Sequence, residues 1–219
     1  MTNLRKLFFT TAYLIACIGI SQAQELSIRG GFNLAKISYK AGDKVIHPHG
    51  YKYNPGFNIG PIIEFPLKSL FSLESGFLFT LKGLKESYSS NNYLNKINLF
   101  YAEIPVLLKL SYPIGKTKIF IAAGGYAATG LFGYYIGAAD VNSVRVHTQE
   151  NVNWGYNENT TKRLDYGLKF GAGLKIKAFQ VGTAYGYGLL DIMNNRSYKY
   201  RNRVIEFYVT YRVKCFKKQ

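Results

Sequence analysis

The sequence predicts an all-β fold: an eight-stranded antiparallel up-and-down transmembrane β-barrel with both termini in the periplasm. Three observations lead to this prediction. The chain begins with an export signal, apolar and polar residues alternate over strand-length segments, and short connections alternate with long ones. A strand sends successive side chains to opposite faces, so a barrel strand in a membrane needs one apolar face for lipid and one polar face for the interior.

The N-terminal segment has the form of a secretory signal peptide. Arg5 and Lys6 form a basic region, residues 7–20 are almost entirely apolar, and small residues lead up to Ala23. The apolar stretch is too short to predict a spanning helix, so any spanning elements are expected to be strands. With cleavage after Ala23, the chain divides into a signal peptide, residues 1–23, and an outer-membrane β-barrel domain, residues 24–219.

The chain has two cysteines, Cys17 and Cys215. Cys17 lies in a segment that resembles a lipobox, but the apolar run continues past it, which favours an ordinary signal residue. Removal of the signal would leave Cys215 alone, so no intramolecular disulfide is expected. A lone thiol at the end of the last predicted strand is expected to face lipid or the membrane interface.

The protein is strongly basic. The chain has 28 Lys and Arg against 12 Asp and Glu, a net charge of +16, and loss of the two bases in the signal would leave +14. The basic residues are scattered through the predicted strands of an exported protein, so nucleic acid is not an expected partner. Outer-membrane lipid with anionic headgroups is the expected partner, and other cell-envelope proteins are possible ones.

The clearest alternation lies in Leu164–Lys177, LDYGLKFGAGLKIK. One face of this segment carries charges and glycines, and the other carries large apolar side chains. Similar alternation recurs along the chain, whereas residues 118–133 are rich in small residues on both faces and leave their orientation open. The predicted strands are residues 26–37, 56–66, 70–83, 97–112, 118–133, 164–177, 178–191 and 203–216.

The connections between these strands alternate in length. Short connections are expected at residues 66–69, 113–117 and near Ala178, whereas long polar loops are expected at residues 38–55, 84–96, 134–163 and 192–202. Short turns at one end and long loops at the other are typical of outer-membrane barrels. Aromatic residues near the predicted strand ends indicate girdles at the two membrane interfaces.

Charged residues recur on the polar faces and are expected to point into the barrel. Eight strands enclose a space that side chains fill, so a porin role is not expected. Buried charges must be paired, so each inward glutamate is expected near a Lys or Arg, and we favour a structural network over a gate or proton path. Inward glycines are expected to make room for these long side chains. Besides Lys82, the interior charge network is predicted to include Arg29, Glu64, Glu74, Glu103, Lys109, Asp165, Lys169, Lys175, Glu206 and Arg212.

Catalytic, cofactor and metal sites are not predicted. The three histidines are His47, His49 and His147, all in predicted loops. A hydrolase would need one of these histidines beside a serine or aspartate. No serine or aspartate lies at a sequence spacing from them that would indicate a catalytic pair. The two histidines of the His-Pro-His segment are weak evidence for a metal site.

Several segments carry a resemblance to a known family. Tyr101–Lys109, YAEIPVLLK, and Leu164–Leu174, LDYGLKFGAGL, resemble strands of the PorT-like outer-membrane β-barrel proteins of Bacteroidetes, and Gly30–Asn33 and Tyr187–Ile192 are similar as well. The resemblance covers the predicted mature chain and implies an outer-membrane barrel. The namesake of that family is linked to secretion of gingipain-type proteases, a role that fold resemblance alone does not transfer.

The sequence favours a non-enzymatic outer-membrane barrel whose four loops or periplasmic turns serve binding or a membrane complex. One alternative is a lipid-modifying barrel enzyme, which would need a histidine, a nucleophile and an acid converging at one rim. The other is a soluble lipocalin-like carrier, which would need an apolar interior and a polar exterior. Large aromatics on the predicted outward faces argue against that carrier.

Overall fold

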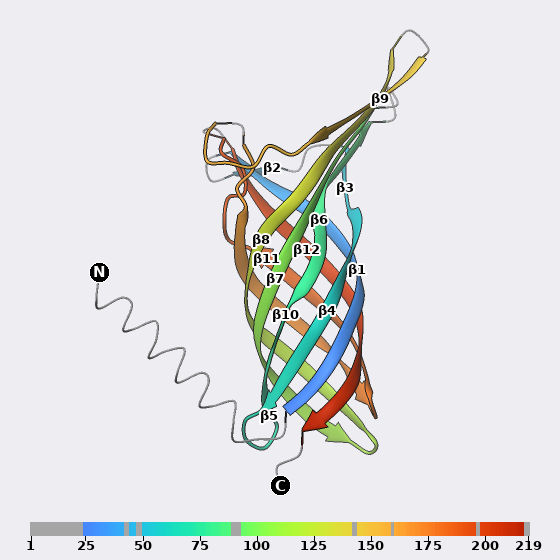
Figure 1. Cartoon of the computed structure of the whole chain (residues 1–219), viewed down its shortest axis with the longest axis vertical. Coiled ribbons are helices and arrows are strands. Elements are labelled where there is room, and N and C mark those ends of the chain that lie inside the picture. Colours follow the sequence, from blue (N-terminus) through green and yellow to red (C-terminus); the bar gives the residue numbers. More distant parts are fainter. Residues whose placement is uncertain are drawn as a thin grey trace, which may run out of the picture.

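The computed structural model describes residues 24–41, 44–46, 50–88, 93–141, 144–158, 160–195 and 198–216. Tilted strands form a tall barrel, and both ends of the described chain lie at the end with the short turns (Figure 1). The signal peptide predicted at residues 1–23 lies outside the described residues. The described residues contain no helix with the length and hydrophobicity needed to cross a membrane.

All the regular elements of the described chain are strands. The first half contains β1 (Gln24–Ala41), β2 (Lys44–Ile46), β3 (Tyr51–Lys52), β4 (Asn54–Pro66), β5 (Phe71–Gly76) and β6 (Leu78–Tyr88). The second half contains β7 (Tyr93–Ile114), β8 (Thr117–Val141), β9 (Val144–Asn151), β10 (Leu164–Ile176), β11 (Phe179–Gly188) and β12 (Lys199–Phe216).

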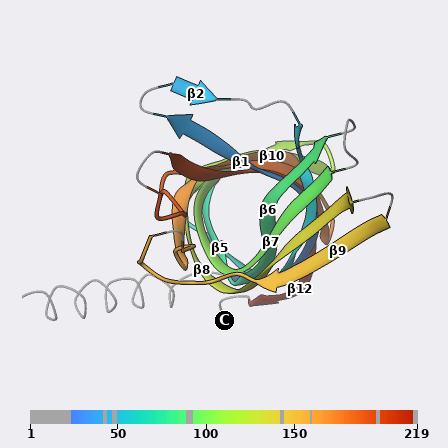
Figure 2. The same ribbon diagram turned by 90° about the horizontal axis from the view of Figure 1, so that it is seen from above.

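Eight strands close into a ring, as predicted, and all neighbours are antiparallel (Figure 2). The order is β1, β4, β5 with β6, β7, β8, β10, β11, β12 and back to β1. β5 and β6 are two parts of one strand, because both pair with β4 and β7 in one register on either side of Phe77. The closing pair, β1 with β12, runs from Gln24 opposite Phe216 to Lys40 opposite Lys199.

Three short turns join the strands at the end where the described chain begins and ends. Each turn contains a residue with positive φ: Ser69 at 54°, Gly115 at 60° and Lys177 at 55°. A positive φ is the conformation that tight hairpin turns require, and only glycine adopts it without steric cost. The short connections therefore lie where the sequence predicts them.

The exterior of the ring is apolar. In β10 the outward Leu168, Phe170 and Leu174 are more than 40% exposed, whereas the inward Asp165 and Lys169 are buried. A soluble lipocalin-like carrier needs the reverse arrangement, so the structure disfavours that alternative. On the side of β4 to β8, aromatic rings stack in a patch that we call the aromatic cluster: Phe57, Phe79, Phe100, Phe132 and Tyr134.

The structure orients the strand that the sequence left open. Along β8, Phe120 and Tyr126 are buried and point into the barrel, whereas Ile119 and Ile121 are exposed on the outside. A register shift beside Phe100 then changes the pairing with β7. Small residues surround the two inward rings, which is why the sequence of this strand shows little alternation.

The prediction of a long polar loop at residues 134–163 is wrong for residues 134–151. β8 continues to Val141 and turns back as β9, so residues 134–151 form a hairpin that projects beyond the ring (Figure 1). Every residue of β9 is exposed, so the segment has no apolar face for sequence analysis to detect. Strands of 22 residues in β7 and 25 in β8 are also about twice the 9–11 that cross a bilayer.

Candidate functional site

The inward faces of the strands bring charged side chains together in two connected groups. The upper group lies toward the loops and links five residues from β6, β7, β10 and β12. Lys82 Nζ lies 3.0 Å from Asp165 Oδ2 and 2.8 Å from Glu103 Oε2. Lys169 also pairs with Glu103, and its Nζ lies 2.7 Å from Glu206 Oε1. All five side chains are at most 3% exposed, so these charges are stabilised by one another.

Hydrogen bonds complete the upper group. Asn202 Nδ2 donates to Asp165 Oδ2 over 2.9 Å, and the hydroxyl of Tyr126 lies 3.4 Å from the same oxygen. The Lys82 ammonium lies 4.2 Å from the centre of the Tyr126 ring, a cation–π distance. The Asp165 carboxylate is therefore held by a base, an amide and a phenol.

The lower group lies toward the short turns and begins deep in the barrel. Arg29 Nη2 lies 2.8 Å from Glu74 Oε1, and Lys109 Nζ lies 2.5 Å from Glu74 Oε2. Lys109 also reaches Glu64 over 3.1 Å. The Arg29 guanidinium stacks 4.0 Å from the centre of the Tyr208 ring and donates to Thr210. Each charge in this part has at least one opposite charge in contact.

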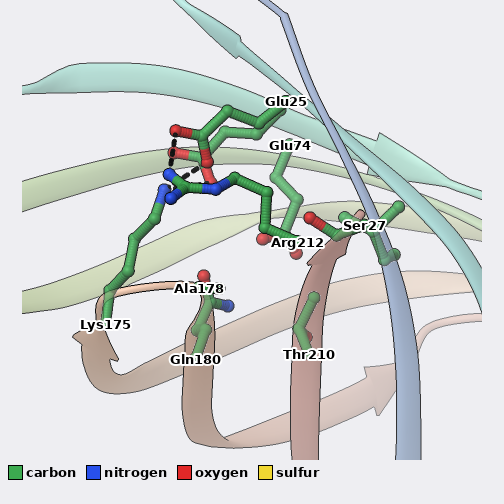
Figure 3. A pocket seen from close by; sticks show the side chains of 10 residues that line it. Glu25, Ser27, Glu74, Lys175, Ala178, Gln180, Thr210 and Arg212 are labelled. Carbon is green, nitrogen blue, oxygen red and sulfur yellow. Dashed lines mark hydrogen bonds and ion pairs between the residues drawn. The ribbon is translucent and has the colours of Figure 1, made fainter. Parts of the chain in front are cut away.

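The lower group continues to the rim at the short turns (Figure 3). Lys175 Nζ lies 2.5 Å from Glu25 Oε2 and 3.7 Å from Glu64, and Arg212 lies 3.2 Å from Glu25. These side chains line a cavity of about 10 Å³, the size of one water molecule. Because Arg212 is 33% exposed, this end of the network meets solvent.

The network is electrically balanced. Its bases are Arg29, Lys82, Lys109, Lys169, Lys175 and Arg212, and its acids are Glu25, Glu64, Glu74, Glu103, Asp165 and Glu206. Six bases and six acids cancel, so the net charge of +16 belongs entirely to residues outside the network.

Three of the inward glycines lie against aromatic rings rather than against the long charged side chains for which we expected them to make room. A Cβ on Gly182 would lie 2.7 Å from the Tyr208 ring, and one on Gly173 would lie 2.6 Å from the Phe120 ring. Gly167 faces Tyr126 in the same way, at 2.9 Å. At these three positions the absence of a side chain leaves room for a ring of a neighbouring strand. Alternation alone reveals glycine on an inward face but not what covers it.

An apolar cap closes the interior at the loop end. Ile192 and Leu99 are fully buried, and Val152 is 5% exposed. The segments after β9 and after β11 bring Val152 and Ile192 over the barrel mouth, against Leu99 of β7, and Thr161 forms β-bridges to both Trp154 and Met193. The sequence predicted exposed polar loops here, and that expectation is wrong for these segments. Tyr200, which lies near the start of a predicted strand where aromatic residues suggested an interface girdle, is partly buried and packs against the same cap.

The structure places all ten predicted network residues on the inward faces, and each forms an ion pair with at least one other charged residue. Lys82, predicted to face inward with them, pairs there as well, and so does Glu25, which the prediction did not include. Glu25 follows the predicted cleavage site by two residues, before any alternation is visible. A buried amide pair was also missed: Asn58 donates to Asn33 over 2.6 Å, and Asn33 donates to Thr80.

No arrangement for enzymatic chemistry is seen in the described residues. His147 is exposed on β9 opposite Ala138, and Ser87 lies on β6. His47, His49, Ser89 and Ser143 lie outside the described residues. Within the described ranges, no group of three or more His, Cys, Asp or Glu side chains is arranged to hold a metal ion.

Comparison with solved structures identifies outer-membrane barrels of similar architecture but low sequence identity. Ail of Yersinia pestis, solved with the heparin analogue sucrose octasulfate, is 15% identical over 87% of this chain and 99% of its own, with a TM-score of 0.40. OprG of Pseudomonas aeruginosa is 13% identical over 90% and 98%, with a TM-score of 0.47. Neisserial surface protein A is 11% identical over 87% and 98%, with a TM-score of 0.44.

No curated protein matches the chain. Residues 21–194, most of the sequence, match the family described as outer membrane protein β-barrel domain. A β-barrel domain of an outer-membrane protein agrees with the closed ring and the apolar exterior described above. The chain therefore belongs to the outer membrane protein β-barrel domain family, and its place is the outer membrane.

Proposed function

We propose that the protein is a non-enzymatic, non-conducting membrane anchor that presents its loop end, including the β8–β9 hairpin, for binding at the cell surface or within a membrane complex. The observation that carries the proposal is the closure of the interior. Two ion-pair groups fill the lower and middle barrel, and the apolar cap covers the loop end. A barrel filled in this way has no path for solutes, whereas its strands extend well past the membrane.

The proposal includes an orientation and an export route. The signal peptide, residues 1–23, is removed during export, and the short turns face the periplasm. The loop end then faces outward, as in other bacterial outer-membrane barrels. The alternation of short and long connections supports this arrangement. The finer resemblance to PorT-like proteins of Bacteroidetes stays a prediction.

Outer-membrane lipid with anionic headgroups is part of the same proposal. The charge balance of the interior supports it, because every uncompensated basic residue lies outside the network. Lysines at the short turns, such as Lys116 and Lys118, are exposed. Basic side chains near an anionic surface contribute about 1 kcal/mol each to membrane association.

Surface labelling tests the orientation. With Cys215 replaced by Ser, a single cysteine is introduced either at His147 on β9 or at Lys116 in the turn between β7 and β8. A membrane-impermeant maleimide added to intact cells should label His147→Cys at once and Lys116→Cys only after the outer membrane is permeabilised. The reverse pattern would show that the hairpin faces the periplasm and would refute the proposal.

Planar-bilayer recording tests the closed interior. The folded protein should give no stable conductance steps, because neither the charged groups nor the cap leaves an open path. A porin of known conductance, recorded in the same bilayers, checks that the assay registers an open barrel. Regular single-channel steps from the unaltered protein would contradict a non-conducting anchor.

A further inference from the structure

Three lysines on neighbouring strands form a row on the outer surface near the loop end. Lys52 of β3 pairs directly with Lys85 of β6, and Lys85 pairs directly with Lys96 of β7. Directly opposite residues of an antiparallel sheet point to the same face, with Cβ atoms about 5 Å apart. We call these three residues the lysine row. It extends over roughly 10 Å, twice that spacing.

The lysine row faces away from the interior. Leu84 and Ile97, the sequence neighbours of Lys85 and Lys96, are both buried in the apolar cap cluster. Since successive side chains of a strand alternate, Lys85 and Lys96 point to the outside of the barrel. Lys52 lies opposite Lys85 and is exposed.

Acidic partners for the row are absent among the described contacts. No ion pair or hydrogen bond of the described residues joins Lys52, Lys85 or Lys96 to a carboxylate. Glu86 belongs to the other face of β6, because it follows Lys85 directly. Like charges placed opposite each other destabilise a sheet, so a row of this kind is stabilised by an anion supplied from outside.

The position of the lysine row along the strands indicates how far from the acyl chains that anion lies. On β7, Lys96 lies four residues from Phe100 of the aromatic cluster, and on β6, Lys85 lies six residues from Phe79. At about 3.3 Å per residue along tilted strands, the row stands roughly 10–15 Å nearer the loops than these rings. Aromatic clusters mark the interface between acyl chains and headgroups. The lysine row therefore lies farther from the acyl chains than a simple phospholipid headgroup does. It lies at the level of phosphate groups that are attached to the sugars of a glycolipid.

We propose that the lysine row binds the phosphate groups of a phosphorylated glycolipid in the outer leaflet. The inference rests on the proposed function, because it requires the loop end to face outward from the membrane. Three ammonium groups across roughly 10 Å can hold two phosphates of one headgroup, each as a point-charge contact. Lys36, whose ammonium lies 5.2 Å from the centre of the Tyr53 ring, flanks the row on β1.

The test uses the mature barrel in phosphatidylcholine nanodiscs, with diphosphoryl lipid A as the probe. The unaltered protein is compared with the triple variant Lys52→Gln/Lys85→Gln/Lys96→Gln, and bound lipid A is counted by native mass spectrometry. Because each lysine contributes about 1 kcal/mol at an anionic surface, the triple variant should bind lipid A on the order of 100-fold more weakly. Lipid A should also raise the temperature at which the unaltered barrel loses its compact form on gels.

A matched control removes the same charge from the other end of the barrel. The variant Lys116→Gln/Lys118→Gln/Lys177→Gln changes three exposed lysines at the short turns, to which the proposed function assigns a general attraction for anionic headgroups. It should therefore weaken the binding of lipid A and of phosphatidylglycerol alike, whereas the lysine-row variant should weaken the binding of lipid A far more than that of phosphatidylglycerol. Equal binding by the unaltered protein and the lysine-row variant would overturn the inference. So would an equal thermal shift from inorganic phosphate or from phosphatidylglycerol of the same total charge. A barrel that fails to form in phosphatidylcholine alone would refute the membrane anchor itself, and the glycolipid site with it.

Discussion

Lys169 shows at the scale of one residue how the interior is held. It extends from β10 and contacts Glu103 of β7 and Glu206 of β12, neither of which neighbours β10 in the ring. The lysine thus joins strands that share no backbone hydrogen bonds. Removing one partner of a buried ion pair leaves an uncompensated charge, which typically costs 3–5 kcal/mol.

We expect Lys169→Met to lower the free energy of unfolding by about 3–5 kcal/mol, measured by urea unfolding in detergent. The main cause is Glu206, for which Lys169 is the sole base within ion-pair distance in the described chain. The double variant Lys169→Met/Glu206→Gln should recover part of the loss, because the orphaned carboxylate is removed. Additive effects of the two changes in a double-mutant cycle would contradict the pairing.

Alternation allowed the inward charged residues to be chosen from sequence, because the side-chain period of a strand is two. The partners could not be chosen in the same way. Lys175 pairs with Glu25, 150 residues earlier, and Lys82 pairs with Asp165, 83 residues later. Such contacts depend on the stagger of strands across the ring, which local patterns do not encode.

Gly182 provides a second test at the residue scale. A methyl group at this position would collide with the Tyr208 ring, whereas one at Gly186 would meet Val204 at an ordinary 3.7 Å. We expect Gly182→Ala to destabilise the barrel by about 1–3 kcal/mol and Gly186→Ala to change stability little. Urea unfolding of both variants gives the comparison. Equal losses would indicate a general cost of replacing glycine rather than a collision with the ring.

At the scale of elements, the β8–β9 hairpin is separate from the ring that it extends. β9 pairs only with β8 among the described strands. Its residues were assigned to a loop because neither of its faces is apolar, and strand formation there depends on backbone pairing alone. The cap was missed for another reason: its residues outside the ring, such as Val152 and Ile192, are few and lie in segments without alternation.

Shortening the hairpin should leave the barrel intact. Replacing residues 137–148 by Asn-Gly joins Ile136 to Gln149, which are already opposite each other. We expect the free energy of unfolding to change by less than about 1 kcal/mol, because exposed tips tolerate deletion. Unfolding in urea measures the change. A chain that no longer folds would show that the hairpin supports the ring.

The cap should open independently of the ring. Ile192→Asp places a charge in a fully buried apolar site, so the segment around Lys162 should become sensitive to trypsin while the barrel stays folded. Leu189→Asp, at a position that is 38% exposed, is the control and should leave the digestion pattern unchanged. Unaltered resistance at Lys162 in the Ile192 variant would refute the cap.

The whole molecule has an apolar outer surface around the ring and an interior filled by charges that balance. Its excess of basic residues lies outside that interior network. We expect it to show heat-modifiable migration after extraction from outer-membrane fractions, with the unheated form running faster than the boiled form. Such behaviour follows from a closed ring in which the backbone of every ring strand is paired on both sides. Recovery from the soluble periplasmic fraction, with one migration position, would contradict the barrel in the membrane.

The seam, the pairing of β1 with β12 that closes the ring, has a consequence for the synthesis and assembly of the protein. It joins Gln24 to Phe216 and continues to Lys40 and Lys199, so the first and last strands of the described chain are mutual neighbours. A chain that ends before β12 cannot complete this pairing, because β12 follows all the other described strands in the sequence. Pairing across such a sequence separation is slow, since the entropy of closing a long loop is lost before contacts form. We therefore expect the chain to cross the periplasm with the seam edges of β1 and β12 unpaired, and to depend during that interval on protection from aggregation at those edges.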